Sequence, residues 1–158
     1  MSVGIGLISK AIEIIYKKMM AFQVVYERLF DSYYVKLQDA FASEANVVGG
    51  WQMIGYVAPG AANSGDVGTT SNFEYTNSGA TDKAATVAID SFDQIEWGAA
   101  NIVALNACKA QDKGAAAASA NWTVKVIGAS NGNSLSYEFK VNDDDCKPLT
   151  ASFESMGK

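Results

Sequence analysis

The sequence predicts an α+β fold in which one long N-terminal α-helix packs on a single antiparallel β-sheet. Residues 5–47 contain no proline, and their large apolar side chains recur in steps of three and four, which is the helical period. Beyond Gly49 the chain holds both prolines and most of its 14 glycines, as strands and turns do. Two alternating runs, 122–126 and 135–141, flank Asn131-Gly132 and indicate an antiparallel hairpin.

The apolar stripe of this helix forms one seam, with the charged side chains outside it. Its members are Ile5, Ile8, Ile12, Ile15, Met19, Phe22, Tyr26, Leu29 and Tyr33. A continuous helix up to Gly49-Gly50 would be on the order of 65 Å long. That length exceeds a small domain, so we interpret the helix as an assembly element.

The seam loses its phase after Tyr33. The next position in phase is Lys36, and the apolar residues move to Leu37, Ala40 and Phe41. The helix face therefore turns near residues 31–34. One interpretation is that its two halves pack on different surfaces, and the other is that two segments of different origin meet there. We divide the chain into an N-terminal amphipathic segment, residues 1–32, and a globular head, residues 33–158.

Further elements follow from local patterns. Residues 51–57 and 84–90 are predicted strands, 73 and 75 share one face of a short strand, and 150–154 is a final strand. Residues 91–108 fit either a strand or a short helix. Small-residue loops are expected at 61–71, 77–83 and 110–120.

Composition bounds the class of protein. The chain has 158 residues, enough for one domain with an extension, and a net charge of −5. Residues 1–46 carry five basic and five acidic side chains, so the excess acidity lies in the head. That distribution argues against a nucleic-acid partner. The apolar N-terminal stretch is interrupted by charges, so it predicts neither a transmembrane helix nor a secretory signal peptide.

The inventory of reactive side chains argues against an enzyme. The chain has no histidine, which removes His-dependent triads and His-bearing metal sites. Residues 60–68 lack the Gly-Lys-Ser/Thr ending of a phosphate-binding loop. We expect no catalytic residues and no cofactor.

Three features carry alternatives. Asp143, Asp144 and Asp145 invite a calcium site, but they lack EF-hand spacing, so a solvated turn is the default interpretation. Trp51, Trp97 and Trp122 would suit sugar stacking; core burial is favoured for Trp51 and Trp122, and Trp97 is left open. The two cysteines are either both free or joined across a loop of about 38 residues.

The order of these elements, together with local sequence, resembles type IV pilins and the related type II secretion pseudopilins. The resemblance covers residues 33–158 and rests on residues 34–41, Gly50-Trp51, 54–56, 58–60 and 72–75. It implies a structural subunit of a bacterial cell-surface filament, assembled by helix packing with copies of itself or related pilin subunits. It also implies an extracellular location, a Cys108–Cys146 disulfide, and loops that expose adhesive surface. Leu37, Phe41 and Trp51 would then join the helix to the sheet.

Residues 1–32 depart from that family. Its members begin with a nearly uncharged membrane helix that carries an early glutamate, whereas here charges recur and no such glutamate is present. We interpret the segment as a replacement or fusion for the membrane helix, the alternative being a divergent natural subunit. Two other functions stay open: a stand-alone carbohydrate-binding or adhesin module with a surface or polysaccharide ligand, and a membrane-surface amphipathic protein.

Overall fold

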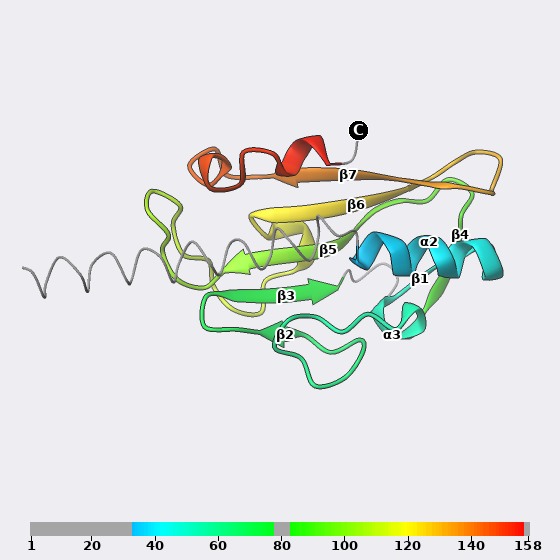
Figure 1. Cartoon of the computed structure of the whole chain (residues 1–158), viewed down its shortest axis with the longest axis horizontal. Helices are drawn as coiled ribbons and strands as arrows, with labels where there is room; N and C mark the ends of the chain where they lie inside the picture. The colour runs from blue at the N-terminus through cyan, green and yellow to red at the C-terminus, as the bar shows by residue number, and fades with distance from the viewer. Residues whose placement is uncertain (1–32, 78–82, 157–158) are drawn as a thin grey trace, which may run out of the picture.

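The computed structural model describes residues 33–77 and 83–156, and these are mostly β-structure (Figure 1). The predicted fold class, a long N-terminal helix on one antiparallel sheet, is wrong. The described residues form a five-stranded and a two-stranded sheet with two short helices. The elements are α2 (Tyr33–Ala45), β1 (Val47–Gly49), α3 (Trp51–Ile54), β2 (Gly68–Thr69), β3 (Phe73–Asn77), β4 (Thr86–Ala88), β5 (Asp93–Asn101), η1 (Ala117–Ser119), β6 (Trp122–Gly128), β7 (Leu135–Val141), η2 (Lys147–Thr150) and η3 (Phe153–Ser155).

Helix α2 ends earlier than its sequence predicts. Asn46 takes a left-handed backbone conformation, with φ 60°, and the chain leaves the helix there. The β-branched Val47 and Val48 then form β1, which pairs antiparallel with β4. The last two residues of the predicted helix are therefore a strand. Its residues 5–32 lie outside the described part of the chain.

The larger sheet has the strand order β2-β3-β5-β6-β7, with every neighbouring pair antiparallel. Figure 1 shows β2 and β7 at its two edges, and α2, α3, β1 and β4 together at one end. The predicted hairpin is present, with Trp122 opposite Val141 and Asn131-Gly132 in its turn. Residues 91–108, left open by the sequence, contain the nine-residue strand β5.

Two predicted strands are wrong. Residues 51–54 form the single turn α3, because Gly50 is extended before it and Gly55 ends it with φ 75°. Of residues 150–154, Thr150 ends the 3-10 turn η2, which contains Pro148, and residues 153 and 154 begin η3. In both cases a few apolar residues of a helical turn pack against the core. Over so short a run, the apolar pattern of a helical turn cannot be distinguished from that of a strand.

Strand β5 is covered closely by η1, and Gly98 makes this possible. A Cβ at Gly98 would lie 2.6 Å from the Ala117 carbonyl oxygen and 2.7 Å from its Cα. We expect Gly98→Ala to lower the free energy of unfolding by about 1–3 kcal/mol, because the neighbour is backbone and cannot swing aside. Urea unfolding measures the loss. Ala117→Gly in the same chain should not restore stability, and an unchanged midpoint for Gly98→Ala would disprove this close packing.

Candidate functional site

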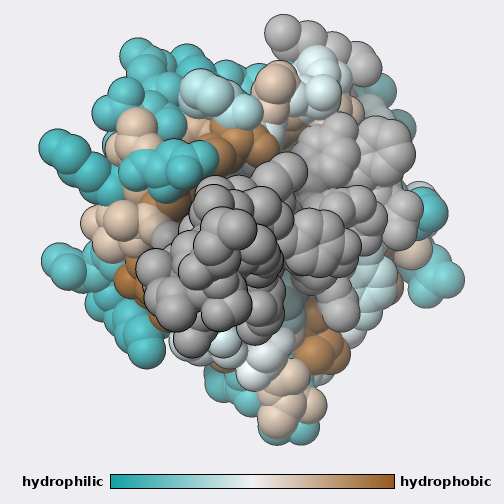
Figure 2. All heavy atoms as spheres, turned by 60° about the vertical axis from the view of Figure 1, so that its left-hand side comes forward, coloured by the Kyte–Doolittle hydropathy of each residue, from teal (hydrophilic) through white to brown (hydrophobic). Residues whose placement is uncertain are grey.

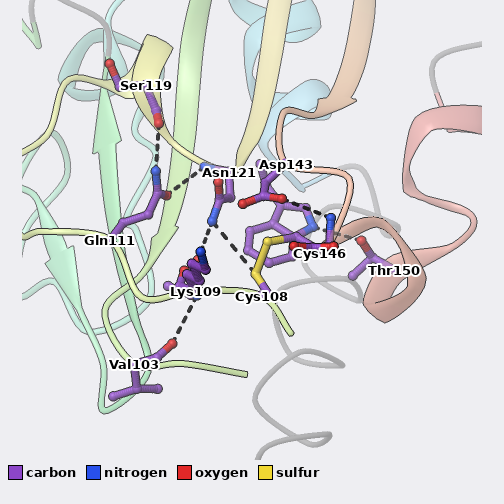
Figure 3. Close-up of a disulfide and its surroundings, with 12 residues drawn as sticks. Val103, Cys108, Lys109, Gln111, Ser119, Asn121, Asp143, Cys146 and Thr150 are labelled. Carbon is purple, nitrogen blue, oxygen red and sulfur yellow. Dashed lines mark hydrogen bonds between the residues drawn. A yellow bond between two sulfur atoms is a disulfide. The ribbon is translucent and has the colours of Figure 1, made fainter. Parts of the chain in front are cut away.

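The feature that combines the two cysteines, buried polar side chains and the predicted loop 110–120 is the region around Cys108 and Cys146. The two sulfurs are 1.97 Å apart and both residues are fully buried. The predicted disulfide is therefore confirmed. It joins the segment 102–121, which follows β5, to the C-terminal segment 142–156, which follows β7 (Figure 3). We call these two segments and their disulfide the clasp.

Asn101, the last residue of β5, organises the first segment from inside. Its amide nitrogen donates to the carbonyl oxygens of Val103, at 3.0 Å, and Lys109, at 2.9 Å. Its amide oxygen accepts from Asn121 Nδ2 at 2.7 Å. Asn101 is fully buried, so all three bonds replace water that the folded chain excludes.

A second set of hydrogen bonds, made by side-chain amides, holds residues 111–121 in place. Gln111 Nε2 donates to the Ser119 carbonyl oxygen at 2.8 Å, and the Asn121 backbone N–H donates to Gln111 Oε1 at 2.8 Å. Asn142 Nδ2 donates to the Ala120 carbonyl oxygen at 2.7 Å. Figure 3 shows Gln111, Asn121 and the disulfide side by side. Side-chain amides thus serve here as partners for backbone groups that no strand or helix satisfies.

The C-terminal segment is fixed at two more points. Trp122 Nε1 donates to Thr150 Oγ1 at 2.8 Å, and the rings of Phe139 and Phe153 meet edge to face at 5.4 Å. Trp122 and Phe153 are both fully buried. The segment after β7 is therefore part of the core and not a loose tail.

The candidate calcium ligands do not converge. Asp143 Oδ1 accepts the backbone N–H of Asp145 at 2.9 Å, and Asp144 pairs with Lys147 Nζ at 2.9 Å. Among residues 33–77 and 83–156 no group of three Asp, Glu, Cys or His side chains could hold a metal ion. The acidic run forms a turn that leads into Cys146.

The three tryptophans are core residues and offer no exposed stacking surface. Trp51, Trp97 and Trp122 are at most 1% exposed, and each indole N–H has a partner. Their acceptors are the Glu96 carbonyl oxygen, Tyr56 Oη and Thr150 Oγ1. The open position of Trp97 is thereby decided in favour of the core.

The three residues predicted to join the helix to the sheet all contact the core. Leu37 and Phe41 are half-buried and pack against the core, and Trp51 is fully buried. The most buried stripe of α2 is a different one, formed by Tyr34, Gln38 and Ala42. Of the predicted seam, Tyr33 is exposed at the start of α2, and the other eight residues lie outside the described part.

Gln38 is the residue that the sequence analysis missed. Its side-chain amide bonds both polar groups of the Gly49 backbone: Nε2 donates to the carbonyl oxygen at 2.8 Å, and the N–H donates to Oε1 at 2.9 Å. Glycine is needed at position 49 because a Cβ there would lie 2.8 Å from the Phe41 ring. A buried glutamine in an apolar stripe is a signal for such a bond, but it does not name the partner.

Helix α2 is also tied to β7 by a hydrogen bond from Tyr137 Oη to Asp39 Oδ1 at 2.6 Å. Burial raises the pKa of the Tyr137 phenol, and the bond to Asp39 raises this pKa further. Burial likewise raises the pKa of Tyr34, and the charge of Glu96 adds to the effect. Both groups favour their neutral forms in the folded chain.

The raised pKa of Tyr137 predicts that the folded chain loses stability in alkaline solution. A phenol whose folded-state pKa is raised stabilises the fold fully below its unfolded pKa of about 10, and that contribution disappears as the pH rises above it. We expect Tyr137→Phe to be less stable than the parent at neutral pH and to lose less on going to high pH. Urea unfolding at a series of pH values tests this. Equal alkaline slopes for the two proteins would show that Tyr137 does not titrate with unfolding.

No family model, curated protein or solved structure matches the chain. Within the described ranges, no helix has the length and apolar character needed to cross a bilayer.

Proposed function

We propose that this chain is a structural subunit of an extracellular bacterial filament, in which residues 1–32 associate with other copies and the head displays its loops. The observation that carries the proposal is the clasp. Its amide side chains, from Asn101, Gln111, Asn121 and Asn142, bond backbone carbonyls, N–H groups and one another. These hydrogen bonds fix the segments 102–121 and 142–156, and a scaffold that displays surface loops needs such fixed segments.

Two further observations support this proposal. A buried disulfide is typical of chains that work in an oxidising environment outside the cytoplasm. On the face shown in Figure 2, hydrophilic side chains cover most of the visible described surface, and apolar residues emerge only in small areas. A head with such a surface can stay exposed to solvent in an assembly whose contacts are made by residues 1–32.

The test is assembly of the full chain. We expect it to form oligomers or fibres that sediment and are visible by negative-stain electron microscopy. Ile15→Asp, which places a charge in the apolar seam, should abolish them, whereas Lys18→Asp, outside the seam, should leave them intact. A full chain that stays monomeric at high concentration, or equal assembly of both variants, would contradict the proposal.

The carbohydrate-binding alternative receives no support from the tryptophans, since all three are buried. The same full chain, titrated with a panel of glycans, would detect such binding independently of assembly.

A further inference from the structure

Tyr56 is the centre of a group of oxidisable aromatic rings. Its ring centroid lies 4.8 Å from that of Trp51, 5.4 Å from Tyr34 and 5.5 Å from Tyr33. Trp97 donates its indole N–H to Tyr56 Oη at 3.0 Å, and its ring is 5.8 Å from Tyr75. We call these six residues the aromatic cluster: Tyr33, Tyr34, Trp51, Tyr56, Tyr75 and Trp97.

Only one member of the aromatic cluster reaches the surface. Tyr33 is 37% exposed, whereas the other five are at most 2% exposed. Tyr33 contacts the central Tyr56 directly. The cluster therefore links buried indole rings to one solvent-accessible phenol through a single intermediate ring.

The chemistry of these side chains gives the link a direction. Tyrosine and tryptophan are among the side chains most readily oxidised by one electron, and rings in van der Waals contact exchange electrons rapidly. A tyrosine that loses an electron must also release its phenolic proton. Burial opposes proton release at Tyr34, whose pKa is raised, while at Tyr33 water can accept the proton.

We propose that the aromatic cluster passes one-electron oxidation from its buried tryptophans through Tyr56 to Tyr33, and that the Tyr33 radicals of two copies couple to form a dityrosine cross-link. Tyr33 is then an oxidative modification site, and its partner is a second copy of this chain. The inference is independent of the proposed filament function.

A one-electron oxidant, such as a photogenerated metal complex, removes an electron from Trp97 or Trp51, and an electron from Tyr33 replaces it by way of Tyr56. Tyr33 releases its hydroxyl proton to water and becomes a neutral radical. Two such radicals form a carbon–carbon bond between ring positions beside the hydroxyls, and the hydrogens at those positions return to the oxygens. In total, two tyrosines lose two electrons and two protons, and the oxidant gains the two electrons.

The test uses the full chain with Tyr16 and Tyr26 replaced by phenylalanine, so that residues 1–32 contribute no tyrosine. It is illuminated with tris(bipyridyl)ruthenium(II) and persulfate, and the products are mapped by mass spectrometry. We expect a covalent dimer joined at Tyr33, with dityrosine fluorescence. Tyr33→Phe should reduce the dimer yield several-fold, whereas Tyr137→Phe, a half-buried tyrosine outside the aromatic cluster, should not. Dimer joined elsewhere, or an equal yield from Tyr33→Phe, would overturn the proposal.

Flash photolysis tests the electron path separately from the cross-link. In the parent, tryptophanyl radical absorbance should decay as tyrosyl radical absorbance rises. In Tyr33→Phe the tryptophanyl radical should live several-fold longer, because its outlet is gone. This surface substitution leaves the buried rings in place, so an unchanged lifetime would disprove the path to Tyr33.

Discussion

Replacing Cys108 and Cys146 together by alanine is expected to lower the free energy of unfolding by about 4 kcal/mol, the loop-entropy value for a closed loop of this size. The disulfide spans 38 residues of sequence, and both of its ends are buried. Without it, the unfolded chain gains freedom, while the folded chain must hold residues 102–121 and 142–156 through hydrogen bonds and packing alone. Urea unfolding of parent and variant measures the difference.

The parent protein unfolded in the presence of a reductant is the matched control, since it keeps both cysteine side chains. Its stability should fall by a similar amount. A loss below about 1 kcal/mol in both cases would show that the disulfide adds little to stability, as occurs when strain or residual denatured-state structure cancels the entropy gain.

Gln38→Leu is expected to cost about 2–4 kcal/mol, because it leaves two buried backbone groups of Gly49 without partners. Leucine is close to glutamine in side-chain volume, so the loss of stability reports the missing hydrogen bonds to Gly49 and not a large cavity. The exposed Gln94 of β5 is the matched control, and Gln94→Leu should change stability by no more than about 0.5 kcal/mol. Similar effects of the two substitutions would contradict the role assigned to Gln38.

Gln38→Glu adds a pH test of the same contact. The carboxylate still accepts from the Gly49 N–H but cannot donate to its carbonyl oxygen, and burial raises its pKa in the folded state. Stability should therefore be highest below the unfolded pKa of about 4.3 and should fall as the pH rises above it. A flat profile would show that the glutamate leaves the buried site.

The sequence pattern correctly predicted the β6–β7 hairpin, whose strands and turn are adjacent in the sequence. The β6–β7 hairpin follows from alternation around Asn131-Gly132, because the turn and both strands are contiguous in sequence. The disulfide followed only from the resemblance to pilins, since two cysteines 38 residues apart are consistent with free thiols as well. The predicted fold class is wrong because the described residues form two sheets with two short helices. The predicted helix end is wrong because the helical period was extended through residues 46–48, where Asn46 leaves the helix and β1 begins.

The contacts that organise the clasp could not be predicted from pattern. Asn101 meets Asn121 across 20 residues, and Gln38 meets Gly49 across a helix end and a strand. Amide side chains carry no periodic signal, and each can donate or accept, so the sequence does not identify their partners. Apolar character predicts Leu37 and Phe41 as the packing face, whereas the more buried stripe of α2 contains the polar Gln38.

Hydrogen exchange before and after reduction of the disulfide tests the central claim, that the Cys108–Cys146 disulfide fixes residues 102–121 and 142–156 to the sheet. In the oxidised protein, backbone amides bonded inside the clasp, such as those of Gln111 and Asn142, should exchange slowly. After reduction, exchange in both segments should accelerate while β3 and β5 stay protected. Unchanged exchange in both segments after reduction would contradict the account.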